Sequence, residues 1–208
     1  MITQNSVEKF LDDLAGGAPT PGGGSAAAII GAMGAALVSM VCSVTIGRKG
    51  LEEVEPEMQM VREQSEKLRG RLTAMVAEDI AAFDGLMAAY RLPKLSEGDK
   101  LRRAEAIQTS LRAATETPLD CARACAQVIG LAERAGKSGY AGVISDAGVG
   151  VLAAQAALRS AALNVHINAP SLKDREFAGH ATLEVERLLE SSARRSEAVY
   201  ALVRGRLG

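Results

Sequence analysis

Apolar residues recur every three or four positions along most of this chain, and glycine, proline or serine separates the runs. This spacing places apolar side chains on one side of an α-helix, and no strand-like two-residue alternation interrupts it. The pattern predicts helices over 6–15, 26–47, 56–92, 97–116, 119–135, 146–168 and 172–203, with a flexible connection over 136–142. Pro118 either starts a new helix or kinks the old one. We therefore expect residues 1–208 to form a single all-α domain, a multihelical bundle of long antiparallel helices.

The segment 26–47 carries no charged residue, which predicts a central, buried helix. It is long enough to span a bilayer, but it lacks aromatic anchors and a positively charged flank before it. We therefore expect a soluble protein with no membrane partner. Small side chains recur along the segment at four-residue spacing and form a ridge on which another helix can pack closely; they are Ala27, Gly31, Ala35, Ser39 and Ser43.

A glycine loop, PTPGGGS over 19–25, precedes this helix. Ser25 is a good N-cap for a helix that begins at Ala26. A helix start presents unpaired N–H groups and the positive end of the helix dipole, so it suits a polar or anionic ligand group. A second cap is expected at Ser145, with Asp146 just inside it, before another helix rich in small residues.

Composition and charge narrow the class of partner. Hydrophobic residues make up 48% of the chain and aromatic residues only 3%, a composition typical of helices with an ample core. The formal net charge is -1, with acids and bases interspersed, so no nucleic-acid partner is expected. Acidic residues near the N-terminus argue against a secretory signal, which predicts a cytoplasmic protein.

The cysteines number three, an odd count for a disulfide framework. Cys121 and Cys125 lie one helical turn apart, a spacing that can hold a metal when other ligands converge. Only His166 and His180 are available to help. Small buried thiols are the favoured interpretation, and we expect a reduced protein without a metal site.

Standard catalytic motifs are absent from the sequence. There is no Walker loop, no dinucleotide-binding glycine motif after a strand and no nucleophile elbow. Asp79 instead stands out, because it lies on the apolar stripe of its helix, where a carboxylate needs a partner or a function. Asn164 and Asn168 share one helix face, where their amides can hold the edge of a heterocyclic ligand or join neighbouring helices. Carboxylates and amides without a metal suit hydrolysis or addition–elimination on a substrate that is already electrophilic.

Four blocks of sequence resemble the cyclodeaminase/cyclohydrolase family, the family of the C-terminal domain of formiminotransferase-cyclodeaminase. They are APTPGGGSAAA over 18–28, MGAALVSMV over 33–41, SDAGVG over 145–150 and NVHIN over 164–168. The resemblance covers nearly the whole chain and keeps the order and spacing of the blocks. PTPGGGS is its most specific part.

This resemblance implies an all-helical homodimer that binds a tetrahydrofolate derivative as substrate in a cleft between protomers, with no metal or separate cofactor. It implies hydrolysis of 5,10-methenyltetrahydrofolate to 10-formyltetrahydrofolate in one-carbon metabolism. One alternative is a formiminotetrahydrofolate cyclodeaminase, which releases ammonia. Another is a non-catalytic helical module that binds folate or only dimerises.

The family's motifs map onto specific positions of this chain. Its two acids fall on Asp79 and Asp146, of which one is the base or electrostatic partner and one can grip the pterin. The sequence does not divide these roles between them. Family members often follow the basic turn after the central helix with an aromatic residue, whereas this chain has Gly50 and Leu51. The positions implied in substrate binding are Pro21, Gly22, Gly23, Gly24, Ser25, Lys49, Asn164 and Asn168.

Overall fold

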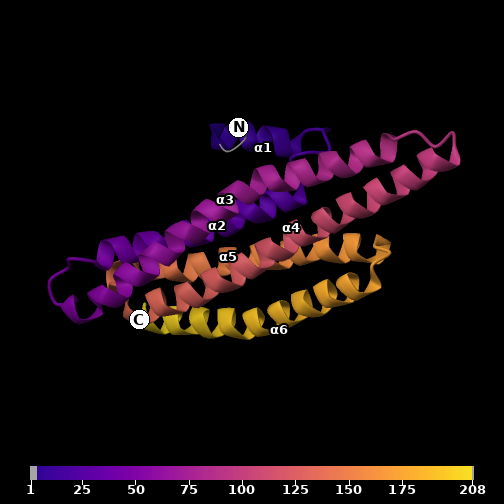
Figure 1. Cartoon of the computed structure of the whole chain (residues 1–208). Coiled ribbons are helices and arrows are strands. Elements are labelled where there is room, and N and C mark those ends of the chain that lie inside the picture. Colours follow the sequence, from indigo (N-terminus) through magenta and orange to yellow (C-terminus); the bar gives the residue numbers. More distant parts are fainter. Residues whose placement is uncertain (1–3, 208) are drawn as a thin grey trace.

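A computed structural model describes residues 4–207, and within them every regular element is a helix (Figure 1). The prediction of an all-α fold is confirmed. The α-helices are α1 (Val7–Ala15), α2 (Gly23–Thr45), α3 (Glu55–Arg91), α4 (Glu97–Ser138), α5 (Ile144–Asn168) and α6 (Arg175–Arg206). Three single-turn 3-10 helices join them, namely η2 (Glu52–Val54), η3 (Ala141–Val143) and η4 (Ala169–Ser171).

The five long helices run side by side along the length of the molecule (Figure 1). α2 packs against α3 and α5, and α5 packs against α2, α4 and α6. α3 and α4 form a helical hairpin, with α6 beside α4. The main hydrophobic core draws side chains from all five of these helices, because each turns its apolar stripe inward.

α2 and α5 are antiparallel neighbours. Gly23, at the start of α2, lies beside Asn164, whereas the backbone N–H of Tyr140, just before η3, donates a 2.9 Å hydrogen bond to Thr45 Oγ1 at the end of α2. At their crossing the backbones touch: a Cβ on Gly34 would lie 2.9 Å from Gly150 O, and one on Gly150 would lie 3.1 Å from Gly34 O. Only glycine permits so close an approach.

The small-residue ridge of α2 is confirmed for four of its five positions. Ala27, Gly31, Ala35 and Ser39 are buried, but Ser43 is exposed, because a four-residue spacing drifts about 40° per step around a helix of 3.6 residues per turn. Gly31 faces α4, where a Cβ would lie 2.8 Å from Cys125 Sγ. Close packing on α2 therefore involves both α4 and α5.

Several helix ends differ from the sequence prediction. α2 begins at Gly23 with Gly22 as its N-cap, so Ser25 lies inside the first turn and caps nothing. α5 likewise begins at Ile144, before Ser145. The last helix is capped by Asp174, whose carboxylate accepts a 3.0 Å hydrogen bond from the N–H of Phe177. α2 and α5 thus begin at Gly23 and Ile144 without a side-chain cap.

α4 is one continuous helix that includes Pro118 and continues to Ser138, so the connection expected over 136–142 is shorter. It begins at Glu97, as predicted, and Ser96 and Asp99 form a reciprocal capping box there. The first helix also starts as expected, with Ser6 Oγ accepting a 3.1 Å hydrogen bond from the N–H of Lys9.

Two segments, Gly23–Thr45 and Ala141–Ser171, are long and apolar enough to cross a membrane. In α2 about half of the most apolar stretch, 56%, is buried against other helices, as in the core helix of a globular bundle. Both helices also carry large apolar side chains that remain exposed, and we call the surface that bears them the α2–α5 face. Its exposed side chains are Met33, Val149, Leu152, Leu163 and Ile167.

Candidate active site

The carboxylate of Asp79 meets the first turn of α2. Ser25 Oγ donates a 2.7 Å hydrogen bond to Asp79 Oδ2, and Ser25 is fully buried while Asp79 is half-buried. The same carboxylate lies against the Cα of Gly24, where a Cβ would come 2.6 Å from Asp79 Cγ. A carboxylate on the apolar stripe of α3 therefore has the partner that its position requires.

The glycine block surrounds this contact. Pro21 is buried, Gly22 is the N-cap of α2, and Gly23 is exposed at the helix start. The first bond of the helix runs from the N–H of Ala26 to Gly22 O at 2.9 Å. The N–H groups of 23–25 precede that bond, so they point past the end of the helix, where a polar ligand group can accept hydrogen bonds.

A small cavity of about 10 Å³ lies beside the Asp79 carboxylate, room for about one water molecule. Its walls come from four helices, with Gly24 and Ala28 on α2 and Ala161 on α5. Met75 and Asp79 of α3 and three residues of α4 complete the lining, namely Thr117, Pro118 and Cys121. The α4 residues had no signal in the sequence that linked them to Asp79.

The two asparagines predicted to act together have different partners. Asn164 Nδ2 donates a 3.0 Å hydrogen bond to Ser160 O in its own helix and lies next to Gly23. Asn168 Nδ2 donates a 2.7 Å hydrogen bond to Ala114 O on α4. Of the two functions left open by the sequence, Asn168 joins neighbouring helices, while Asn164 lies beside the glycine block.

Asp146 and Lys49 lie at the other end of α2. Asp146 is half-buried in the first turn of α5, and Lys49 is exposed in the turn that follows α2. α2 separates this end from Asp79 by roughly 25 Å, given 1.5 Å per residue. One chain therefore brings Asp79, Ser25, the glycines and Asn164 together, but leaves Asp146 and Lys49 at a distance.

An aromatic–cation pair accompanies Asp146 and Lys49 at that end. The guanidinium carbon of Arg48 lies 3.3 Å from the centroid of the Tyr140 ring, and the ring packs on the backbone of Gly142. Sequence reasoning missed this pair, because it assigned 136–142 to a flexible connection. The one available signal was a tyrosine in a chain with few aromatic residues.

The cysteines are buried and free. Burial raises the pKa of the Cys42 thiol to about 12, and a hydrogen bond with Cys121, together with burial, raises that of Cys125. Metal ligation requires thiolates, which such surroundings disfavour. Over residues 4–207, no three His, Cys, Asp or Glu side chains converge in a way that could hold a metal ion. His166 instead pairs with Glu186, with 3.2 Å between Nε2 and Oε1, and His180 is exposed.

Residues 6–187 match the sequence pattern of the family described as formiminotransferase-cyclodeaminase. The chain belongs to this family. Among members of the formiminotransferase-cyclodeaminase family, it is 53% identical over 207 residues to a methenyltetrahydrofolate cyclohydrolase of Methylorubrum extorquens, and the match covers 100% of both chains. It is also 32% identical over 191 residues to a formimidoyltransferase-cyclodeaminase of Sus scrofa, which covers 92% of this chain and 35% of that protein.

A solved structure of the family shares the fold. The crystal structure of a formiminotetrahydrofolate cyclodeaminase from Thermotoga maritima superimposes with a TM-score of 0.83 at 30% identity. The match covers 100% of this chain and 98% of the other. The resemblance seen in the sequence is thus confirmed at the level of both family and fold.

Proposed function

We propose that this protein is a methenyltetrahydrofolate cyclohydrolase, which hydrolyses 5,10-methenyltetrahydrofolate to 10-formyltetrahydrofolate. The observation that carries the proposal is the 53% identity, over the full length of both chains, to a protein of that name. The environment of Asp79 supports it, because a carboxylate beside a helix start combines a proton acceptor with hydrogen-bond donors for a polar substrate. The protein acts in the cytoplasm and needs no cofactor besides its folate substrate.

The chemistry suits a carboxylate without a metal. The methenyl carbon bridges two nitrogens as an amidinium-like cation and is open to attack by water. A carboxylate stabilises the cation and takes a proton from the attacking water as the new C–O bond forms. The tetrahedral intermediate then expels the pterin-side nitrogen, which receives a proton, and the formyl group remains on the other nitrogen. Asp79 or Asp146 is the base or electrostatic partner, and the other acid grips the pterin.

We further propose that the protein is a homodimer whose α2–α5 face forms the interface. On α2 no residue is charged, and between 147 and 165 of α5 the only charged residue is Arg159. The face includes Met33, Val149 and Leu163, which are 58%, 54% and 69% exposed. Exposed apolar side chains along α5, next to an uncharged helix that adds Met33, are typical of a surface that a second subunit covers.

A twofold axis across these helices would also complete the site. It would place the glycine block and Asp79 of one protomer beside the Asp146 and Lys49 end of its partner. Asp79 and Asp146, which lie roughly 25 Å apart within one chain, would then meet in one site across the interface. The substrate would then lie in the cleft between protomers, in contact with residues from both.

Subunit complementation tests this dimer. Asp79→Asn and Asp146→Asn dimers, each inactive alone, are mixed after dissociation and reassociation. In a mixed dimer one site carries both substitutions and the other carries neither, so the mixture should regain about a quarter of the wild-type rate. No recovery, although mixed dimers form, would place both acids of a working site in the same chain and contradict the proposal.

A related activity is favoured by a specific observation, since the 30% identical solved structure is named a formiminotetrahydrofolate cyclodeaminase. That enzyme's substrate carries a nitrogen that leaves as ammonia. The deciding assay follows loss of methenyltetrahydrofolate absorbance, and then ammonia from formiminotetrahydrofolate. Accelerated loss with no ammonia supports the cyclohydrolase, and ammonia release supports the cyclodeaminase. Binding without turnover of either substrate would leave only a non-catalytic folate-binding role.

A further inference from the structure

Pro118 leaves a gap in the hydrogen bonding of α4. In a regular helix the N–H of residue 118 would donate to the carbonyl of Ala114, four residues earlier, but proline has no N–H. Yet α4 runs without interruption from Glu97 to Ser138. The carbonyl of Ala114 therefore needs another donor, because an unpaired carbonyl within a packed helix carries a free-energy cost.

Asn168 supplies this donor. Its Nδ2 lies 2.7 Å from Ala114 O, and the residue is half-buried in the last turn of α5. The bond connects positions that are 54 residues apart in the chain. An amide from one helix thus replaces the backbone bond that proline removes from another.

The repaired segment of α4 forms a wall of the cavity beside Asp79. Thr117, Pro118 and Cys121 line that cavity together with Asp79 and Gly24. Thr117 also turns its hydroxyl toward its own helix, donating a 3.0 Å hydrogen bond to Ala113 O. The position of this wall thus depends on how α4 is held between residues 114 and 118.

We propose that Asn168 is a positioning residue that fixes the α4 wall against Asp79 and makes no direct contact with substrate. The proposal rests on the cyclohydrolase activity for its kinetic part, but not for its structural part. Asn164 differs, because its amide bonds within its own helix and lies beside Gly23. Asn164 therefore belongs to the candidate site, whereas Asn168 supports the site from outside it.

A double-mutant cycle tests the structural part. Asn168→Ala is made in the natural chain and in a Pro118→Ala background, where the restored N–H of residue 118 pairs with Ala114 O. Loss of the asparagine should lower the melting temperature by about 4 °C when proline is present and by less than about 1 °C when it is absent. Equal shifts in both backgrounds would overturn the proposal without any reference to catalysis.

Kinetics then tests the positioning role. We expect Asn168→Ala to lower kcat about 10-fold in the natural chain with KM within about twofold, since the substrate loses no contact. In the Pro118→Ala background the same substitution should change kcat less than about twofold. Asn168→Asp should lower kcat at least as much as the alanine variant, because a carboxylate keeps the size but cannot donate to Ala114 O and repels it. A rise in KM of equal size in both backgrounds would mean direct substrate contact and would overturn the proposal.

Discussion

The carboxylate of Asp79 occupies the space into which a side chain at Gly24 would project, with Cγ 2.6 Å from the position of a Cβ there. The glycine block thus has a steric function in addition to its backbone freedom. It lets an acid from the middle of α3 reach the first turn of α2. The position of the Asp79 carboxylate therefore depends on the lack of a side chain at Gly24.

Gly24→Ala should therefore abolish most activity. The added methyl group displaces the carboxylate and breaks its 2.7 Å bond with Ser25, so we expect kcat/KM to fall at least about 100-fold. Gly70→Ala is the matched control, because Gly70 lies within α3 with nothing inside 4 Å of an added Cβ. It should keep full activity and gain about 0.5–1 kcal/mol of stability, measured by chemical unfolding. Comparable activity in the two variants would refute this account.

Ser25 and Asp79 should behave as one unit in kinetics. Asp79→Asn is expected to keep the fold and lose about 100-fold or more in kcat, whereas Ser25→Ala should lose about 10-fold, because the carboxylate loses its donor. In the Asp79→Asn background the serine substitution should cost little further. Circular dichroism checks the fold, and fully multiplicative losses would mean that the two groups act independently. Unchanged turnover in Asp79→Asn would remove this acid from the mechanism.

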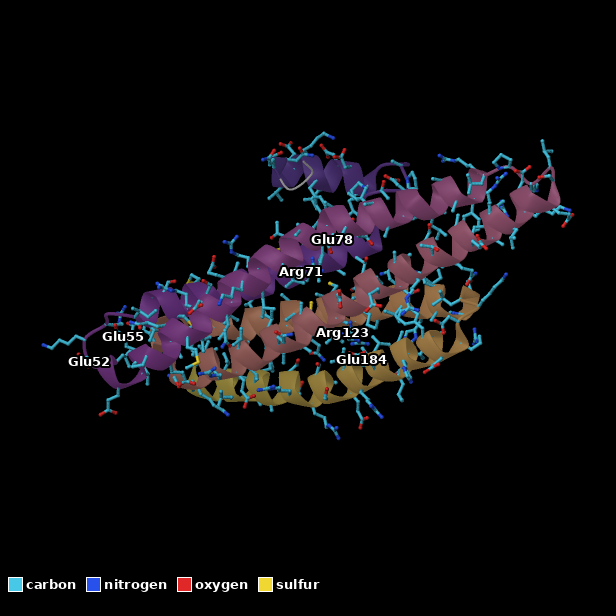
Figure 2. All side chains as sticks on the ribbon, in the orientation of Figure 1. Glu52, Glu55, Arg71, Glu78, Arg123 and Glu184 are labelled. Atoms are coloured by element: carbon cyan, nitrogen blue, oxygen red, sulfur yellow. The ribbon has the colours of Figure 1, made fainter. Side chains whose placement is uncertain are left out.

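An arginine-centred network between α4 and α6 should make stability depend on pH. Arg123 donates to both carboxylate oxygens of Glu184, at 2.7 and 2.6 Å (Figure 2). It also donates to Asp120 at 2.7 Å. Its guanidinium holds the pKa of Glu184 below the usual value. The folded state therefore favours the ionised acid, so its stabilising contribution is present above about pH 4.3 and is lost as the pH falls below it.

Glu184→Gln should accordingly lower the free energy of unfolding by about 1 kcal/mol at pH 7 and by almost nothing at pH 3. Glu190→Gln on the same helix is its control, since the Glu190–Arg194 pair is 3.4 Å long and its side chains are 72% and 76% exposed. We expect less than about 0.3 kcal/mol there at either pH. Urea unfolding at both pH values measures the difference, and an effect of Glu184→Gln that persists at pH 3 would have to come from packing.

The thiols should be inert in the native protein. All three are buried; burial raises the pKa of Cys42 to about 12, and the hydrogen bond with Cys121 together with burial raises that of Cys125, so these two thiols hold almost no thiolate at pH 8. A disulfide reagent should label fewer than about one thiol per chain within minutes, and all three after denaturation. Rapid labelling of a single cysteine in the folded protein would reveal an opening that this packing does not provide.

The helices were predictable because their stripes of apolar residues are long and regular, as in α3, whose start near Pro56 and end near Leu92 followed from the sequence. The caps of the helices were less predictable. Ser25 has the ideal residue type for an N-cap, but its hydroxyl is engaged by Asp79, which is 54 residues away. Local propensity cannot anticipate such a partner, and a tertiary contact decides the outcome.

The candidate site was predictable in its residues but not in its assembly. The acid on an apolar stripe and the glycine loop were visible separately, and the structure joins them. The separation of Asp146 from Asp79 was not visible, because it follows from the antiparallel order of α2 and α5. Nor was the contact of Asn168 with Ala114, which depends on what Pro118 lacks. Long-range pairing of this kind leaves no periodic trace in a single sequence.

The contact of Gly34 with Gly150 has a mechanical consequence for both ends of the helix pair. The crossing acts as a fulcrum, because α2 extends about 15 Å to either side of it. A rotation of about 4° at the fulcrum would move each end by about 1 Å, a displacement large enough to disturb catalytic geometry. One methyl group added at Gly34, far from the Asp79 carboxylate, would therefore act through leverage on the glycine block at the start of α2, whereas Asp146, one turn from Gly150, would move less.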